Sequence, residues 1–260
     1  MMTEVPRPVL KDKKALIIGI ANEHSIAYGC ARAFRELGAD LAVTYLNDKA
    51  KPHVEPLAGE LQASIFMPLD VSEPGELESV FARIEREWKH LDILLHSIAF
   101  APKEDLQGGL LNCSSKGFLT AMDISCHSFI RMARLAAPLM NNGGTMFAMS
   151  YHGAQKVVPN YNVMGPVKAA LEAICRYLAY ELGPRKIRVH AISPGPLKTR
   201  AAGGLTDFDR MLNDAVERSP VGELVDIMDV GFACAFLATP YGRRLTGQTL
   251  YVDGGINIMA

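Results

Sequence analysis

The sequence predicts one α/β domain built on a doubly wound parallel sheet of seven strands, with helices on both faces. Two observations lead to this prediction. Short apolar runs alternate with segments of helical periodicity along almost the whole chain, and the loops that link them are short. The chain has 260 residues, of which 49% are hydrophobic, so it can bury a large core as one undivided domain.

The elements follow one another in a regular order. Strands are expected at residues 15–20, 40–45, 64–69, 91–96, 145–149, 187–192 and 249–252. Helices are expected at residues 25–37, 74–88, 114–141, 161–183, 207–218 and 226–238. Right-handed crossovers would place these helices on both faces of the sheet. Residues 1–12 are expected to form a loose leader, and residues 13–260 the domain itself.

Charge and cysteine content exclude several classes of protein. A formal net charge of −1 gives no general electrostatic reason to bind nucleic acid or an anionic membrane. The five cysteines are odd in number and scattered, without a Cys-x-x-Cys pair, which disfavours disulfides and a metal site and suits the cytoplasm. No apolar run is long enough to span a bilayer, so membrane insertion is not expected.

The first strand and helix have the order of a phosphate-binding unit. Gly19 ends the apolar run and lets the backbone turn, and Ser25 stands where it can cap the helix. The N–H groups of the first helical turn could then meet a pyrophosphate. The spacing is not Gly-x-Gly-x-x-Gly, so an ordinary strand-to-helix turn fits equally well.

The ends of the second and fourth strands are further positions to consider for binding a dinucleotide. Leu46-Asn47-Asp48-Lys49 follows the second strand, where a ribose would lie, and it has no arginine to hold a 2′-phosphate. NADH is therefore favoured, while Lys49 leaves NADPH open. His96 ends the fourth strand, and a satisfied core histidine is a better interpretation of it than a ligand.

The stretch from Ser150 to Lys168 carries the strongest chemical signal. If a helix begins near Tyr161, Lys168 lies about two turns later on the same face, and its charge would lower the phenol pKa from about 10. Such a phenol could stabilise or protonate an oxyanion. The alternative is that Tyr151 and Tyr161 are core residues and Lys168 is solvated. Pro166 also lies close to the start of this helix, where it could kink it.

The sixth strand ends in a segment rich in proline, glycine and alanine. Residues 194–218 are therefore a candidate lid over a substrate site, although a plain surface connection would have the same composition.

Taken together, these motifs resemble the short-chain dehydrogenase/reductase superfamily, and within it the enoyl-acyl-carrier-protein reductases of bacterial fatty-acid synthesis. The resemblance covers nearly the whole chain. It rests on Gly19 with Ser25-Ile26-Ala27-Tyr28-Gly29, on His96-Ser97-Ile98, and on Ser150-Tyr151-His152-Gly153 followed by Pro159-Asn160-Tyr161-Asn162-Val163-Met164-Gly165. Ketoreductases of the superfamily carry Tyr-x3-Lys, but the residue four before Lys168 is Met164. The Tyr-x6-Lys spacing with a second tyrosine upstream is the enoyl-reductase pattern.

The resemblance implies a Rossmann-type fold and an NADH-dependent reduction of the trans-2 double bond of an enoyl thioester. Tyr161 would bind the thioester oxygen, Lys168 the nicotinamide ribose, and Tyr151 would position the substrate. Ala101 would contact the substrate. The implied cofactor residues are Gly19, Ser25, Ile26, Leu46, Asp70, Val71, Ser97, Ile98, Ala99, Lys168, Leu197, Thr199 and Ala201.

The resemblance also implies an enoyl-acyl-carrier protein as partner and a homotetrameric enzyme. Two residues depart from the family pattern: Ala99 stands where glycine is common, and Leu46 replaces a residue that is often polar. Two other functions stay open. One is a reductase of a related enoyl thioester in a specialised lipid pathway, and the other is an NAD-binding scaffold or sensor without turnover.

Overall fold

Seven parallel strands form one sheet in the order β3-β2-β1-β4-β5-β6-β7. The computed structural model describes residues 9–107, 109–197, 199 and 208–259. The strands are β1 (Lys14–Ile18), β2 (Asp40–Tyr45), β3 (Ile65–Pro68), β4 (Ile93–His96), β5 (Gly144–Met149), β6 (Ile187–Pro194) and β7 (Thr249–Val252). All six neighbouring pairs are parallel. The predicted doubly wound sheet is thereby confirmed.

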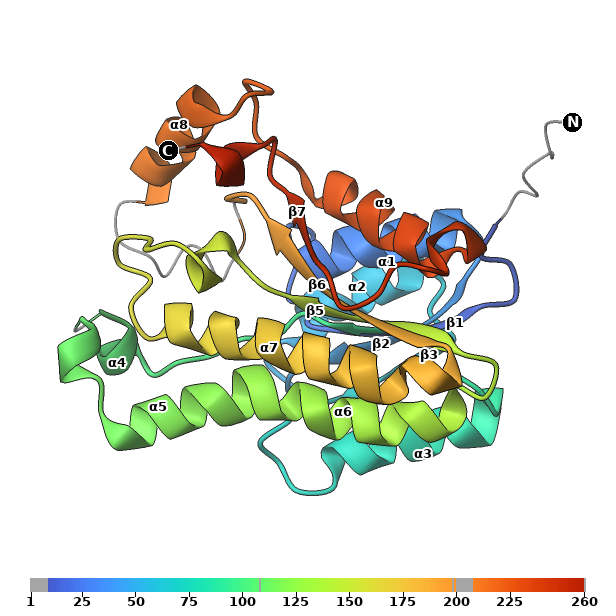
Figure 1. Cartoon of the computed structure of the whole chain (residues 1–260). Helices are drawn as coiled ribbons and strands as arrows, with labels where there is room; N and C mark the ends of the chain where they lie inside the picture. The colour runs from blue at the N-terminus through green and yellow to red at the C-terminus, as the bar shows by residue number, and fades with distance from the viewer. Residues whose placement is uncertain (1–8, 108, 198, 200–207, 260) are drawn as a thin grey trace, which may run out of the picture.

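Helices cover both faces of the sheet (Figure 1). One face carries α1 (Ile26–Glu36), α2 (Lys51–Glu60) and α9 (Ile227–Ala238). The other carries α3 (Glu76–Trp88), α5 (Ser115–Met122), α6 (Ser128–Ala136) and α7 (Met164–Leu182). Two short helices, α4 (Lys103–Gln107) and α8 (Phe208–Arg218), lie at the carboxyl end of the sheet. Within the described residues, no helix combines the length and the apolar character that crossing a bilayer would require.

The alternation of side chains along a strand divides the core into two layers. Leu16 and Ile18 of β1 belong to the cluster shared with α3, α6 and α7, whereas Ala15 and Ile17 belong to the cluster shared with α1 and α9. All four side chains are buried. Successive residues of a strand point to opposite faces, so an uninterrupted apolar run is what a strand covered on both faces requires.

Several elements differ from the sequence prediction. Helix α2 was not predicted, because Pro52 and Pro56 obscure its pattern; Pro52 lies in its first turn and Pro56 inside it. The helix predicted over 114–141 is interrupted by a π-helical turn at Asp123–His127 and ends in a 3₁₀ turn at Ala137–Leu139. Further 3₁₀ turns are Leu110–Asn112, His152–Ala154, Gly183–Arg185, Pro240–Gly242 and Ile256–Ile258.

Leu10, near the C-terminal end of the predicted leader 1–12, is not loose. Residues 1–8 lie outside the described part of the chain, but Leu10 is fully buried, and its N–H donates to the carbonyl of Leu37 at 2.7 Å. An apolar side chain removed from water stabilises the fold, so this residue belongs to the domain. Leu10 therefore packs with the domain, although the prediction placed it in the leader.

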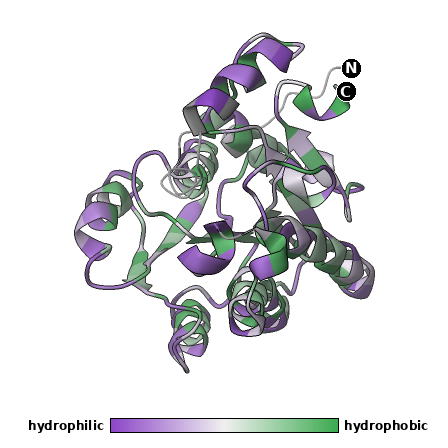
Figure 2. Cartoon of the chain, turned by 90° about the vertical axis from the view of Figure 1, so that its left-hand side faces the viewer, coloured by the Kyte–Doolittle hydropathy of each residue, from purple (hydrophilic) through white to green (hydrophobic). Residues whose placement is uncertain are grey.

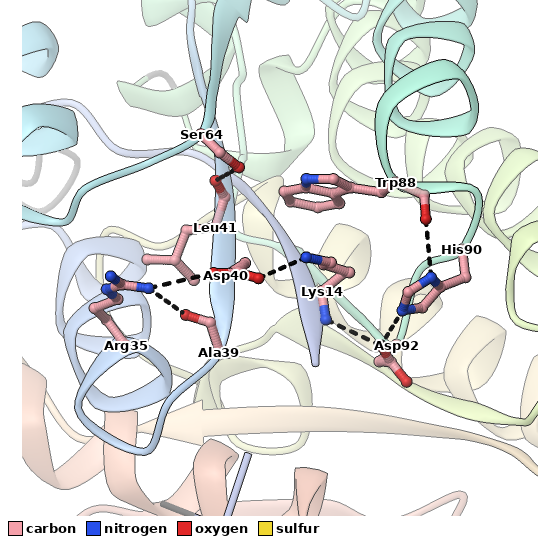
Figure 3. A network of polar contacts seen from close by, with 9 residues as sticks. All are labelled: Lys14, Arg35, Ala39, Asp40, Leu41, Ser64, Trp88, His90 and Asp92. Atoms are coloured by element: carbon pink, nitrogen blue, oxygen red, sulfur yellow. Dashed lines mark hydrogen bonds and ion pairs between the residues drawn. The ribbon is translucent and has the colours of Figure 1, made fainter. Parts of the chain in front are cut away.

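A polar network joins three strands at their amino-terminal ends (Figure 3). The Asp92 carboxylate, just before β4, accepts the backbone N–H of Lys14 at 2.9 Å and the ammonium of Lys13 at 2.8 Å. The ammonium of Lys14 reaches Asp40 of β2 at 2.5 Å. Charged groups thus cover the amino-terminal end of the sheet. The cavities described below lie at the opposite, carboxyl end, and that end faces the viewer in Figure 2.

Candidate active site

A cavity of about 240 Å³ lies beyond the carboxyl ends of β4, β5 and β6. Open α/β sheets bind ligands at this edge. Ten of the residues predicted for the site line it: Ile26, Ser97, Ile98, Ala99, Ala101, Tyr151, Tyr161, Lys168, Leu197 and Thr199. The structure therefore brings together the two tyrosines, the lysine and the small residues that follow β4.

Tyr161 is presented by a turn rather than by the helix. Helix α7 begins at Met164, so the prediction that Tyr161 and Lys168 share a helical face is wrong. Asn160 and Asn162 flank Tyr161 with φ of 64° and 42°, a left-handed conformation that asparagine tolerates better than most residues. The amide of Asn162 donates to the carbonyl of Leu106 at 2.6 Å, which fixes the turn to α4.

The late start of α7 explains how Pro166 is accommodated. Pro166 is the third residue of α7, and the first N–H groups of a helix have no partner within it. The proline therefore costs no intrahelical hydrogen bond and requires no kink before Lys168.

The two tyrosines pack against each other. The rings of Tyr151 and Tyr161 meet edge to face with centroids 5.0 Å apart. Gly153 makes this possible, because a Cβ at that position would lie 2.5 Å from the Tyr161 ring. Gly165 approaches the carbonyl of Gly153 in the same way, since a Cβ there would lie 3.2 Å from that oxygen. Both glycines let the segment after β5 lie against α7.

Lys168 is buried within α7, and its ammonium donates to the carbonyl of Met149 at 2.7 Å. Burial lowers the pKa of Lys168 to about 8, and the nearby thiols of Cys126 and Cys175 and the Glu172 carboxylate oppose that shift. The interpretation of Lys168 as a solvated residue is therefore wrong.

The phenols do not have the lowered pKa that the sequence suggested. Burial raises the pKa of Tyr151 to about 12, and burial together with the neighbouring Tyr151 raises that of Tyr161 well above its usual range. Desolvation disfavours the charged form of a phenol, and it is the largest cause of the raised pKa at both residues. At neutral pH both phenols thus keep their protons and can donate hydrogen bonds into the cavity.

A second cavity of about 430 Å³ adjoins the first and shares Tyr151 and residues 194–196 with it. Its outer wall includes Arg210, Asp214 and Arg218 of α8. Of the predicted lid at 194–218, residues 198 and 200–207 lie outside the described part of the chain, as does the predicted cofactor residue Ala201. The described part of that segment borders both cavities.

The remaining predicted cofactor residues lie at the carboxyl ends of β1, β2 and β3, outside the cavity lining. Leu46 follows β2 and is 53% exposed, and Asp70 with Val71 follows β3. Gly19 has φ of 115°, and a Cβ there would lie 2.1 Å from the carbonyl oxygen of Ser97. Only glycine allows these two strand ends to meet, which leaves a continuous edge suited to an extended dinucleotide.

Ser25 stands at the N-cap of α1, but its side chain does not cap the helix as predicted. Its hydroxyl oxygen instead accepts the N–H groups of Ala21 and Asn22, each at 3.0 Å. The serine thus orders the turn between β1 and α1, because it satisfies two backbone donors that the tight turn would otherwise leave unpaired.

A family model described as "Enoyl-(Acyl carrier protein) reductase" matches residues 19–257. The chain belongs to the enoyl-(acyl carrier protein) reductase family.

Curated relatives agree with this assignment. The NADH-dependent enoyl-[acyl-carrier-protein] reductase FabI of Salmonella typhimurium is 43% identical over 252 residues, which cover 96% of each chain. The reductase of the same name from Escherichia coli is 42% identical, with the same coverage.

Solved structures of the family share the fold. The reductase of Anaplasma phagocytophilum in complex with NAD superposes with a TM-score of 0.94 at 43% identity, and the match covers 99% of this chain and 98% of that one. The Bacillus cereus reductase with NADP⁺ and an indole naphthyridinone gives a TM-score of 0.95 at 39% identity, covering 97% and 99%.

Sequence reasoning missed several residues of this enoyl reductase site. Phe100, Leu106, Met149, Ser150 and Met164 also line the cavity, whereas residues 194–196, which line it too, belong to the predicted lid. Most are apolar, and an apolar residue beside a strand end cannot be told from core by pattern alone. Glu172 was missed as well, although its position one helical turn after Lys168 was a usable signal.

His96 fits its predicted structural role. It is fully buried at the end of β4, and its Nε2 lies 2.8 Å from the hydroxyl of Ser128. Its Nδ1 has no hydrogen-bond partner among the described residues, so the histidine that was predicted to be satisfied is satisfied at one ring nitrogen and not at both.

Proposed function

We propose that this chain is an NADH-dependent enoyl-acyl-carrier-protein reductase, which reduces the trans-2 double bond of an enoyl thioester in fatty-acid elongation. The observation that carries the proposal is the grouping of Tyr151, Tyr161 and Lys168 around one cavity at the carboxyl edge of the sheet, in a chain of this family. A nucleotide-binding scaffold would have no need of two protonated phenols beside a buried ammonium.

The cofactor would lie along the carboxyl edge from Gly19 to Lys168, and when bound it supplies the hydride for the β-carbon of the substrate. Ser97, Ile98 and Ala99 offer the small and apolar surface that a flat ring requires. The Lys168 ammonium would hold the adjacent ribose and add positive charge to the site. Gly19, Ser25 and Ile26 would face the phosphates, and Leu46, Asp70 and Val71 the adenosine.

Tyr161 would act on the substrate oxygen. As the β-carbon accepts hydride, negative charge moves to the thioester oxygen to give an enolate. A protonated phenol in a water-poor cavity stabilises such charge by donating a hydrogen bond. The raised pKa of Tyr161 serves this role, because a phenolate would repel the enolate. Tyr151 would hold the Tyr161 ring and, with Ala101, line the acyl path.

The second cavity suits the acyl chain or the thioester arm, since it continues the first past Tyr151. Residues 194–218 would form its lid. Arg210 of α8 is a candidate contact for an acidic carrier protein, together with Lys198 and Arg200, which lie outside the described residues. Charge complementarity of this kind raises the association rate.

We also propose that the enzyme is a cytoplasmic homotetramer. Large apolar side chains are exposed on the outer helices: Leu119 of α5, Tyr177 and Tyr180 of α7, and Phe232 and Phe236 of α9. Exposed apolar surface on an outer helix commonly marks a contact between subunits.

Two substitutions test the assigned roles. With a medium-chain trans-2-enoyl thioester, Tyr161→Phe is expected to lower kcat by about 100-fold with little change in NADH affinity, because it removes a hydrogen bond made in the transition state. Lys168→Ala is expected to weaken NADH binding as well. The measurement is NADH absorbance in steady state, combined with a fluorescence titration of NADH. Equal rates in wild type and Tyr161→Phe would remove Tyr161 from the chemistry.

A further inference from the structure

Glu172 of α7 is a buried carboxylate that the proposed chemistry does not use. Only 3% of its surface is exposed. The hydroxyl of Ser150 donates to its Oε1 at 2.7 Å, and the side-chain amide of Gln155 donates to its Oε2 at 3.1 Å. A buried charge is costly unless partners of this kind stabilise it, so its position calls for an explanation.

The two partners bracket Tyr151 in the sequence. Ser150 directly precedes Tyr151, and Gln155 follows the 3₁₀ turn at His152–Ala154. The Ser150 N–H also donates to the carbonyl of Ile192 at 2.6 Å, which ties this end of the segment to β6. Glu172 is thus hydrogen-bonded to both ends of the segment 150–155, which carries Tyr151, and attaches this segment to α7.

Glu172 also lies four residues after Lys168 in the same helix, so the two side chains are neighbours on one face. The ammonium of Lys168 donates to Met149, the residue just before Ser150. Lys168 and Glu172 of α7 are therefore hydrogen-bonded to Met149 and Ser150, two successive residues at the end of β5.

Few charged groups face the Lys168 ammonium in the described residues. Those that interact with it electrostatically are His96 of β4, Cys126 of the π-helical turn, and Glu172 and Cys175 of α7, and the phenols Tyr151 and Tyr161 line the same cavity. His96 stays neutral at neutral pH because burial lowers its pKa to about 3, and burial raises the pKa of both thiols. Glu172 is the one carboxylate among these groups, and its interaction with Lys168 favours the protonated ammonium.

We propose that Glu172 is a positioning residue of the reductase site: its two oxygens clamp the segment that carries Tyr151, and its charge keeps the Lys168 ammonium protonated. This inference rests on the proposed function, in that Tyr151 and Lys168 are the groups it serves. A purely structural role would affect only stability, whereas this role sets a pH limit and a turnover rate.

The charge is tested with Glu172→Gln. Glutamine keeps an acceptor oxygen for Ser150, and its NH2 group can donate to the side-chain oxygen of Gln155 once that amide flips, so the substitution removes the charge at nearly constant shape. Without the negative neighbour Lys168 loses its proton at lower pH, so the alkaline limb of kcat/KM is expected to move down by about 0.5 to 1 pH unit. The NADH dissociation constant, measured by fluorescence across the same pH range, is expected to rise at correspondingly lower pH.

The control is Glu85→Gln, which neutralises an exposed carboxylate on α3 and is expected to leave both pH profiles unchanged. Superimposable profiles for wild type and Glu172→Gln would overturn the charge role.

The clamp is tested separately with the double variant Ser150→Ala, Gln155→Ala. These changes remove both side-chain hydrogen bonds to Glu172, while the backbone bond from Ser150 to Ile192 and the bond from Lys168 to Met149 remain. At neutral pH kcat is expected to fall about 10-fold or more, because small displacements of positioned groups are costly, while the NADH dissociation constant stays within about threefold. Unchanged kcat, or a fall in kcat matched by a loss of folded protein in thermal melts, would overturn the clamp.

The two proposals can fail independently. If the wild type binds NADH but does not oxidise it with an enoyl thioester, the proposed function is wrong. The pH dependence of NADH binding in wild type and Glu172→Gln still tests the charge role in that case.

Discussion

At the residue scale, two buried histidines of the sheet, His96 and His190, are expected to make the stability of the fold depend on pH. His190 of β6 is fully buried beside the ring of Phe147, with centroids 6.0 Å apart, and burial together with Arg188 lowers its pKa to about 4. Burial and the nearby Lys168 charge lower the pKa of His96 to about 3. Both residues are therefore neutral in the folded enzyme at neutral pH.

The direction of the pH effect follows from these values. Below about pH 6.5 the unfolded chain takes up a proton at each histidine, while the folded chain does not. Stability is thus fully present above pH 6.5 and is lost as the pH falls toward the folded pKa. By pH 5 the loss is expected to be about 2 kcal/mol for each histidine.

His190→Asn tests this expectation. Urea unfolding at pH 7 and pH 5 gives the loss of stability on acidification, and this loss is expected to be smaller by about 2 kcal/mol in the variant than in wild type. His53→Gln is the control, because His53 is exposed on α2. The same loss in wild type and His190→Asn would contradict the account.

Sequence reasoning at this scale succeeded for residues with a characteristic spacing and failed for residues defined by their surroundings. Tyr151, Tyr161 and Lys168 were found because their spacing is unusual. The predicted direction of the phenol pKa shift was wrong, because spacing does not reveal the burial that raises the pKa of Tyr161. Glu172 was missed because a glutamate on a helix is ordinarily solvated, and its partners lie far away in sequence.

At the scale of elements, the two ends of the sheet have different roles. The amino-terminal end is closed by Asp92, which joins β1 to β4 through Lys13 and Lys14. The carboxyl end carries the cavities. Stability and activity are thus separable by position, as the topology of open α/β sheets suggests.

Asp92→Ala is expected to lower the free energy of unfolding by about 1–3 kcal/mol, because it leaves a strand N–H without its acceptor. The kcat of the folded enzyme is expected to stay at the wild-type value. Urea unfolding and steady-state rates measure the two effects. Glu55→Ala, which removes an exposed pair with Lys51, is expected to change stability by less than about 0.5 kcal/mol. Lost activity at unchanged stability in Asp92→Ala would contradict this division.

Element boundaries were the weaker part of the sequence prediction. All seven strands were predicted, because buried parallel strands read as apolar runs. Helix α2 was missed through its prolines, and the start of α7 was placed three residues early, because nothing in the pattern of residues 161–164 distinguishes a turn from a first helical turn. The late start decides that a loop, rather than a helix face, presents Tyr161.

At the scale of the whole molecule, the sheet order brings distant segments to one edge. Residues that follow β1, β4, β5 and β6 meet there because these four strands are consecutive in the sheet. Strands β1 and β4 pair although seventy-five or more residues separate β1 from β4 in the chain. The fold class was predictable from the alternation of elements. The shapes of the two cavities were not, because they depend on side chains that meet only after folding.

The measurement that tests the central claim most directly compares two substrates of equal chain length. Purified enzyme with NADH is given a trans-2-enoyl thioester or a β-ketoacyl thioester, and NADH absorbance is followed. The position of Tyr161 and Lys168 around the cavity and the absence of a Tyr-x3-Lys pair at Lys168 lead us to expect fast oxidation with the enoyl thioester and a saturated thioester as product. The ketoacyl substrate is expected to react at least about 100-fold more slowly. Faster reduction of the ketoacyl thioester, or no oxidation with the enoyl thioester, would contradict the account.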